Sequence, residues 1–310
     1  MQGVIFNNLP DRFIPNSVFI LSPLLFFVFI KPFYNPIQNP SYIKLILYAC
    51  ILMFLISEGP DLVVVVRDAN YFGALLSSEF PTESNLAYVF GFLFLYFVLE
   101  KYPFRYKLIA VIFLLLCFKR VVLGATFVGI FVFFFASFLN LNVSKRRVWL
   151  VIIALFINLL FIQITILVVE GVYDQVVYEN TGFSLDRLLM GRKTFYTLAF
   201  ESIGYFSWFG AGLGRIDDVI NNYYGIPINL HSEVLRNYLE LGVIFFVIWI
   251  VLLFYQSIFS VKSIVFLCYL NILLLTDNVF IYFEIMFYFY LFMQFFLSEG
   301  LAKIKSKNYG

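Results

Sequence analysis

The stretch VWLVIIALFINLLFIQITILVV, residues 148–169, carries no charged side chain and decides the class of fold. A helix that crosses a bilayer needs about 20 mostly apolar residues, and this stretch reaches that length. Backbone polar groups inside lipid must be paired within the segment, so the stretch is expected to be a helix. The whole chain has the same character. Hydrophobic residues make up 62% of it and charged residues 13%, whereas roughly a quarter of the residues in a soluble domain are charged.

Eight further apolar runs accompany this stretch, and together they predict an all-α integral membrane protein with a polytopic bundle of about nine transmembrane helices. One of them, Lys107–Phe118, crosses the bilayer only if its flanks contribute. The whole chain, residues 1–310, is predicted to be a single polytopic membrane domain. The eight runs are Asn16–Ile30, Tyr42–Ser57, Asn85–Leu99, Lys107–Phe118, Val121–Leu139, Leu241–Ser260, Ser263–Thr276 and Val279–Leu297.

The distribution of lysine and arginine predicts which side each connection lies on. If the spans alternate, one side holds twelve basic residues and two acidic ones, and the other side holds nine basic and sixteen acidic. The positive-inside rule places the basic side in the cytoplasm, with residues 298–310 as a basic tail. Residues 170–240 then form a large extracytoplasmic loop. The cytoplasmic basic residues are Lys31, Lys44, Lys101, Arg105, Lys107, Lys145, Arg146, Arg147, Lys262, Lys303, Lys305 and Lys307.

Other global features exclude several classes of function. Cys50, Cys117 and Cys268 lie far apart within predicted spans, so they are interpreted as packing residues and not as disulfides or a zinc site. The net charge of +2 reflects the cytoplasmic anchoring and implies no nucleic-acid partner. Residues 1–11 lack the basic start and apolar core of a cleavable signal peptide.

A surface helix is predicted in the first half of the loop, capped by Ser184 with Asp186 in its first turn. Its apolar residues recur at three- and four-residue intervals, as in a helix lying on a membrane. Arg192 falls within this apolar stripe, so it is expected to snorkel, to pair, or to meet a ligand. The stripe consists of Leu185, Leu188, Leu189, Tyr196, Ala199 and Ile203.

A second helix is predicted to start near Asn229, after Pro227. His231, the only histidine of the chain, would lie on its apolar face, directed toward the bundle. A histidine titrates near neutrality and can move protons, so His231 is a catalytic candidate; a hydrogen-bonded structural histidine is the alternative. Arg236 has Glu233 and Glu240 within helical reach and is interpreted as structural.

Glycines and basic residues complete the candidate site. The loop GAGLG, residues 210–214, has no preceding strand and no following Lys-Ser or Lys-Thr, so it is not a nucleotide-binding loop. Either a tight turn that ends a helix or a close backbone approach to a phosphate explains it, and Arg215 follows it directly. Lys119 and Arg120 stand at the outer junction of two spans, where charge is costly and a partner is expected. That partner is either Glu284, inside the last span, or a diphosphate; Glu284 itself has a hydrogen bond to a neighbouring tyrosine as its simpler explanation.

The order and spacing of these motifs resemble the O-antigen polymerases and the related O-antigen ligases of bacterial envelopes. The resemblance covers roughly residues 107–249 as a pattern and the whole chain as topology. Two features depart from the family: Ser232 stands where asparagine often follows the histidine, and the chain has fewer spans than many members. The resemblance rests on Gly191-Arg192, on Gly210–Gly214, on His231 with Leu235, on Glu240-Leu241-Gly242 and on Arg120 at the start of an earlier span.

This resemblance implies a glycosyltransferase of the bacterial inner membrane with its active site on the periplasmic face. Its donor and acceptor would be glycans on undecaprenyl diphosphate, joined without a nucleotide sugar, a metal or another cofactor; membrane lipid, a chain-length regulator and a flippase are the other expected partners. His231 would accept or organise the proton of the acceptor hydroxyl. The remaining candidates are Arg120, Arg192 and Arg215 for the departing diphosphate, with Lys119, Glu284, Gly212 and Gly214 as possible support.

Two alternatives remain open from the sequence. An O-antigen ligase, which transfers the chain to lipid A–core, needs the same donor site as a polymerase; the short, atypical form of this chain favours the polymerase. A lipid-linked oligosaccharide flippase would also carry charges inside its spans. A flippase is expected to show internal repeats and a midplane site, whereas the motifs here centre on one outer loop.

Overall fold

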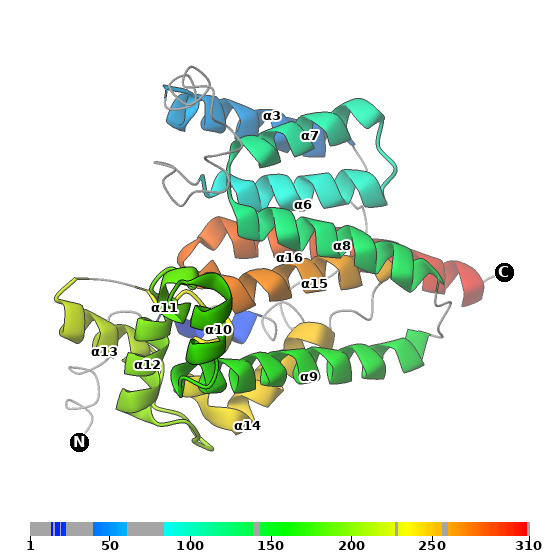
Figure 1. Ribbon diagram of the computed structural model, residues 1–310. Helices are drawn as coiled ribbons and strands as arrows, with labels where there is room; N and C mark the ends of the chain where they lie inside the picture. The colour runs from blue at the N-terminus through cyan, green and yellow to red at the C-terminus, as the bar shows by residue number, and fades with distance from the viewer. Residues whose placement is uncertain are drawn as a thin grey trace, which may run out of the picture. The chain divides into compact units, whose positions relative to one another are not determined.

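The computed structural model describes residues 14, 16–18, 20–22, 40–60, 84–138, 143–226, 229–255 and 260–308. Within these residues every regular element is a helix, and none is a strand (Figure 1). The chain divides into two compact units. The first unit comprises Met1–Phe29, Asn142–Gln256 and Leu274–Ile281, and the second comprises Ile30–Leu141, Ser257–Leu273 and Tyr282–Gly310.

The second unit is built around one buried helix, α6 (Leu86–Leu99), which packs against the unit's five other described helices. Ten of the fourteen residues of α6 are buried, because apolar side chains cover all of its faces. The ring of Phe92 contacts the rings of Phe266, Tyr269, Phe289 and Phe292. The helices of this unit run alongside one another (Figure 1); the others are α3 (Pro40–Ser57), α7 (Phe104–Leu116), α8 (Arg120–Phe138), α15 (Val261–Thr276) and α16 (Phe283–Asn308).

The first unit combines two long helices with a group of short ones. The long helices α9 (Val143–Val169) and α14 (Glu233–Tyr255) pack against each other. Helix α12 packs on α9, and α13 packs on both α12 and α14, so the short helices gather near the C-terminal end of α9 (Figure 1). The short elements are α10 (Asp174–Thr181), α11 (Leu185–Leu188), α12 (Arg192–Ile203), α13 (Arg215–Tyr224) and η2 (Val279–Ile281).

The predicted apolar runs largely coincide with observed helices. Eight of the nine overlap a helix, and the remaining one, Asn16–Ile30, lies mostly outside the described residues. Two helices, Val148–Val169 and Glu233–Tyr255, are long and apolar enough to cross a membrane by length and composition. Much of the apolar surface of α9 is uncovered, including the side chains of Trp149 and Phe156.

The helix predicted across residues 184–203 is wrong in one respect: it is two helices. Ser184 caps the first as predicted, because its side chain accepts the N–H of Arg187 at 3.3 Å. Met190 and Gly191 then adopt left-handed φ values of 56° and 80°, and these end α11 before α12 begins at Arg192. Since an α-helix needs right-handed torsions, the two residues interrupt the stripe.

The start of α14 also differs from the prediction. The helix begins at Glu233 and not near Asn229, since His231 has a left-handed φ of 60°. Ser232 is the N-cap: its Oγ accepts the N–H of Leu235 at 3.2 Å, and its carbonyl accepts the N–H of Arg236 at 3.0 Å. His231 therefore precedes the helix and does not share its apolar face.

Two glycines allow the loop before α13 to lie against a kink in α14. Gly242 interrupts α14 with a φ of 73°, and a Cβ added there would lie 2.3 Å from the backbone nitrogen of Gly210. A Cβ added at Gly210 would lie 2.2 Å from the carbonyl oxygen of Glu240. Around this contact, Ala211 N–H donates to Leu239 at 3.0 Å and Val243 N–H donates to Ser207 at 3.0 Å. Only glycine provides both the torsion and the space.

Replacing Gly242 by alanine is expected to destabilise the protein by about 2 kcal/mol or more, because the new Cβ combines a left-handed torsion with overpacking. The measurement is the thermal unfolding midpoint of the purified protein in detergent. Gly124→Ala in α8 is the matched control: a Cβ there meets nothing within 4 Å, so a neutral or slightly stabilising effect is expected. Equal midpoints for the two variants would contradict the role assigned to Gly242.

Candidate functional site

His231 occupies the turn before α14, and its side chain is 40% exposed. Its neighbours Leu230 and Ser232 are both fully buried, so the backbone on either side is anchored in the core. The backbone N–H of His231 donates to Oδ1 of Asn278 at 2.9 Å. Because of the left-handed torsion and these anchors, the imidazole points out of the core, while its Nδ1 stays next to the side chain of Asn278.

Asn278 also determines which imidazole nitrogen carries the proton. Its Nδ2 lies 3.2 Å from Nδ1 of His231. Since Oδ1 of Asn278 already accepts the backbone N–H, the atom that faces the ring is the amide nitrogen, which can only donate. Nδ1 of the neutral imidazole is therefore an acceptor, and Nε2 carries the hydrogen. His231 thus presents a hydrogen-bond donor on its exposed side.

Arg192, the first residue of α12, reaches the same short segment. Its Nη1 donates to the carbonyl oxygen of Thr276 at 3.1 Å, two residues before Asn278. Arg192 was expected to snorkel, to pair or to meet a ligand, and the structure shows it paired with a backbone carbonyl. One turn later Tyr196 is buried; burial raises the pKa of Tyr196, and the charge of Arg192 opposes the rise. The phenol there is neutral and packs under the arginine.

The segment Thr276–Asn278 thus binds both residues: Arg192 through the carbonyl of Thr276, and His231 through the side chain of Asn278. It begins at the last residue of α15 and precedes η2, and Oδ1 of Asp277 accepts the N–H of Asn278 at 2.8 Å. Asp277 Oδ1 also lies 4.0 Å from Nδ1 of His231. Asp277 and Asn278 were not among the predicted site residues. The available signal was a polar Thr-Asp-Asn triplet between two apolar runs, but its partners lie 47 and 84 residues away in the chain.

A buried ionic cluster centred on Arg236 lies next to this segment. Its burial and pairing agree with the prediction that Arg236 is a structural residue. Arg236 is fully buried, and its Nη1 donates to both carboxylate oxygens of Glu233, at 3.1 and 3.0 Å. Its Nη2 donates to Asp217 of α13 at 3.0 Å, a partner that helical periodicity could not indicate. Glu233 in turn accepts the N–H of Phe280 at 3.1 Å, and this bond holds η2, just after Asn278.

The glycine loop leads into α13, and the N-terminus of that helix binds a carboxylate of the protein itself. Gly214 precedes α13 with a φ of 82°, and the Glu240 carboxylate accepts hydrogen bonds from the backbone of Gly214 and from Ile216 N–H, the latter at 3.1 Å. Gly212 N–H donates to the carbonyl of Glu240 at 3.0 Å. Neither of the two explanations for the loop describes Gly210, because the group that approaches it closely is the backbone of Glu240 and not a phosphate. Arg215 is exposed at the first position of α13.

The other candidates belong to the second unit. Lys119 is buried, and its Nζ donates to Oδ1 of Asn85 at 3.1 Å and lies 4.6 Å from the ring centroid of Tyr88. An amide and an aromatic ring therefore serve as partners for this charge. Arg120 is exposed at the first position of α8, and Glu284 is half-buried in the first turn of α16.

No family model, curated protein or solved structure matches this chain. Among the described residues, no group of three or more histidine, cysteine, aspartate or glutamate side chains is arranged to hold a metal ion.

Because His231 is the only histidine, selective ¹⁵N labelling of histidine reports on one imidazole. We expect the spectrum of the protein, purified with a histidine-free tag, to show a protonated Nε2 and an unprotonated Nδ1 for the neutral ring. Asn278→Asp replaces the donor facing Nδ1 by an acceptor, so it is expected to move the proton to Nδ1. A spectrum that already shows Nδ1–H in the unmodified protein would contradict the arrangement.

Proposed function

We propose that the protein is a membrane glycosyltransferase that polymerises undecaprenyl-diphosphate-linked oligosaccharide repeat units into a surface polysaccharide. It acts without a metal or cofactor at the periplasmic face of a bacterial inner membrane. The observation that carries this proposal is that His231 and Arg192 both bond to the segment Thr276–Asn278. A proton-handling ring and a phosphate-binding guanidinium held by one short segment suit a donor that leaves as a diphosphate.

The uncovered apolar surface supports the membrane location. Helix α9 exposes apolar side chains along most of its length, which a soluble protein rarely does. Aromatic side chains are also exposed in the loop beside the kink of α14, as in the belts where proteins meet the membrane surface. They are Tyr205, Phe206, Trp208 and Phe209.

Polar pairs at the two ends of α6 support the predicted sidedness. At its C-terminal end, Glu100 pairs with Lys262 at 2.7 Å, and both residues were predicted to be cytoplasmic. At its N-terminal end, Asn85 pairs with Lys119, predicted to lie on the outer side. Residues assigned to the same side of the membrane are thus neighbours within this unit.

The proposed reaction joins an acceptor sugar hydroxyl to the anomeric carbon of the donor. The oxygen–carbon bond forms, the bond from the anomeric carbon to the lipid diphosphate breaks, and negative charge builds on the diphosphate. Arg192 and Arg215 of the first unit are the candidates for stabilising that charge, and Arg120 is the candidate that the sequence predicts in the second unit. His231 donates from Nε2 and orients the acceptor hydroxyl, whose proton passes to an oxygen of the departing diphosphate. The direction of the Asn278 bond supports organising the hydroxyl over accepting its proton.

Ser232, which stands where the family often has asparagine, is compatible with the resemblance to that family. Ser232 caps α14 through its side chain, and asparagine, the residue often found at this position in the family, is an equally good cap. An asparagine at this position could therefore cap the helix as Ser232 does, so the difference does not weaken the resemblance.

The test of the proposal is to incubate purified protein with its lipid-linked repeat unit in the absence of nucleotide and metal. We expect a ladder of longer lipid-linked products. A product transferred only to lipid A–core would identify a ligase instead, and the absence of any transfer would overturn the proposal.

In this assay, Arg192→Ala and Arg120→Ala are each expected to remove most activity. Lys at either position should restore only part, because it lacks the two-pronged donor fork. Lysine can still bond to the carbonyl of Thr276, so complete rescue by Arg192→Lys would show that the arginine is only structural. The control is Arg187→Ala, which removes an exposed arginine of α11 that lies over the Phe183 ring and should leave product formation unchanged.

His231→Ala is expected to abolish polymer, with a loss of roughly 10²–10⁴-fold if the ring acts in proton transfer. Single lipid-linked units should accumulate on the outer leaflet. His231→Gln supplies an amide N–H near the place of Nε2–H, so noticeable rescue is expected for an organising role and little rescue for a base. Metal chelation should change neither variant. Accumulation on the cytoplasmic leaflet would instead favour a flippase.

A further inference from the structure

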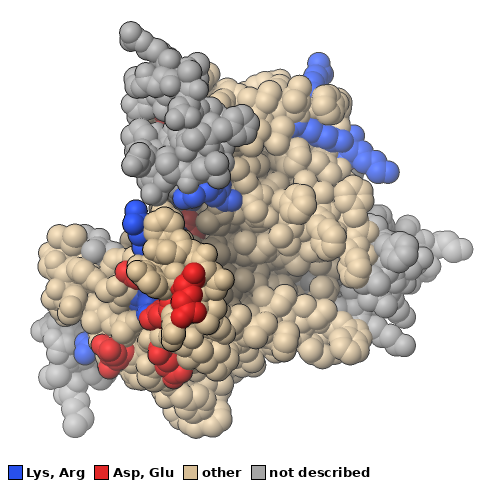
Figure 2. Space-filling view, viewed as in Figure 1, with Lys and Arg blue, Asp and Glu red and all other residues tan. Residues whose placement is uncertain are grey.

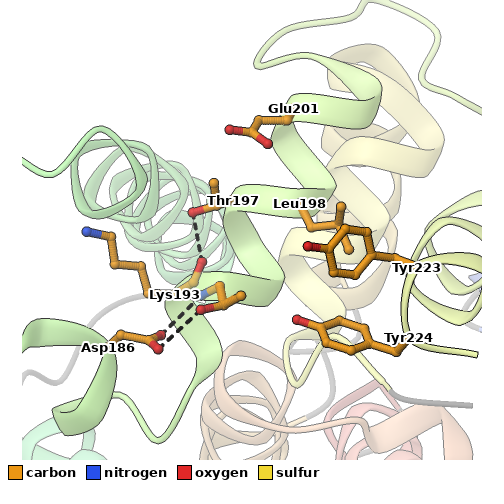
Figure 3. Close-up of a pocket in the computed structure, with 8 residues that line it drawn as sticks. Asp186, Lys193, Thr197, Leu198, Glu201, Tyr223 and Tyr224 are labelled. Atoms are coloured by element: carbon orange, nitrogen blue, oxygen red, sulfur yellow. Dashed lines mark hydrogen bonds between the residues drawn. The ribbon is translucent and has the colours of Figure 1, made fainter. Parts of the chain in front are cut away.

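A pocket of about 360 Å³ lies between α12 and α13, with α11 at its edge. Its size is near the lower end of the range for small-molecule sites, about 300–1,000 Å³. Figure 3 shows the two tyrosines on one side and the side chains of α12 on the other. The polar and aromatic lining residues are Asp186, Lys193, Thr194, Thr197, Glu201, Tyr223 and Tyr224.

Part of this lining is held in place by its own hydrogen bonds. Asp186 accepts the backbone N–H and the hydroxyl of Thr194, both at 3.1 Å. The amino group of Lys193 is engaged by the carboxylate of Asp174, and in Figure 3 it points away from the tyrosines. The wall on the α11 side is therefore formed before any ligand arrives.

The aromatic wall consists of a supported ring and an exposed one. Tyr224 packs on Phe195 of α12, with ring centroids 5.3 Å apart. Tyr223 stands edge-on to Tyr224 at 4.9 Å, yet it is 68% exposed. The hydroxyls of both tyrosines point toward α12 (Figure 3). An exposed ring contributes little to the core, but it offers an apolar face and a polar tip to a ligand.

The charge of the pocket excludes a diphosphate. It contains two carboxylates and one lysine, and that lysine is already paired. Figure 2 shows further acidic side chains gathered over the short helices of the first unit, and an anion would be repelled there. A polyprenyl tail is also unsuited, because carboxylate and hydroxyl groups in the lining would lose their hydration without gaining partners.

A neutral sugar fits these groups. A sugar ring has apolar C–H faces, which match the rings of Tyr223 and Tyr224 and the side chain of Leu198. Its rim of hydroxyls can both donate and accept, which suits the Glu201 carboxylate and the tyrosine hydroxyls. We propose that this pocket binds one or two neutral sugar residues of the glycan, away from its diphosphate.

The position of the pocket along α12 connects it to the candidate reaction site. Arg192 begins α12, and Glu201 lies nine residues further along the same helix, a rise of about 14 Å. One rigid helix thus carries a diphosphate-binding candidate at its first residue and a sugar-binding wall in its later turns. In this respect the inference rests on the proposed function: a glycan held at its diphosphate by Arg192 would extend into the pocket.

The test uses the oligosaccharide that mild acid releases from the lipid-linked donor, titrated into the full-length protein in detergent. Saturation-transfer NMR measures contact with sugar protons, and the titration gives the affinity. Tyr223→Ala is expected to weaken binding at least tenfold, and Tyr223→Phe to weaken it less because the ring remains. Glu201→Gln should also weaken binding. Tyr178→Ala in α10 removes an equally exposed tyrosine outside the pocket and should change nothing.

The outcomes separate this inference from the proposed function. Either of two results would overturn the sugar pocket even if the ladder assay succeeds. One is an unchanged affinity for the oligosaccharide in Tyr223→Ala. The other is that inorganic diphosphate or choline competes for the pocket as well as the oligosaccharide itself does. Sugar binding that depends on Tyr223 and survives His231→Ala supports the pocket even if no ladder forms. If both hold, Tyr223→Ala should raise KM for the lipid-linked unit at least tenfold and leave kcat within about twofold.

Discussion

The buried guanidinium of Arg236 is the constraint around which the first unit is organised. A fully buried charge is tolerated only when it is paired, and removing one member of such a cluster costs about 3–5 kcal/mol. The pairs of Arg236 come from its own helix through Glu233 and from α13 through Asp217. Since Glu233 also accepts the N–H of Phe280, one cation fixes α13, the start of α14 and η2 together. His231 and Asn278 precede two of these elements, His231 near the start of α14 and Asn278 at the start of η2.

The cluster contains more carboxylates than cations, and two of its carboxylates also accept backbone N–H groups. Glu233 accepts a backbone N–H in addition to the guanidinium. Glu240 lies at the N-terminus of α13, where it accepts the N–H of Ile216. Helix α13 is therefore already committed to a protein carboxylate. In the proposed function, the diphosphate would therefore be bound by side chains such as the candidate arginines and not by this helix N-terminus.

Sequence patterns predicted the parts of this fold that depend on local spacing. Apolar runs located the long helices, Ser184 was identified as a cap, and Arg236 was paired correctly with Glu233 because both lie on one helical face. The patterns failed where a torsion breaks the helical period, at Gly191 and at His231. They also failed where the partner is remote in the chain, as with Asn278, because periodicity carries no information on contacts between distant segments.

The two residues that sequence reasoning missed give His231 a partner in each of its protonation states. Asn278 donates to Nδ1, so it stabilises the neutral ring with its hydrogen on Nε2. A protonated ring would carry a hydrogen on Nδ1 as well, which the amide nitrogen cannot accept. Asp277 stands 4.0 Å from Nδ1 and supplies an acceptor for that form. The donor and the acceptor near Nδ1 thus come from two adjacent residues, Asn278 and Asp277, and each suits one form of the ring.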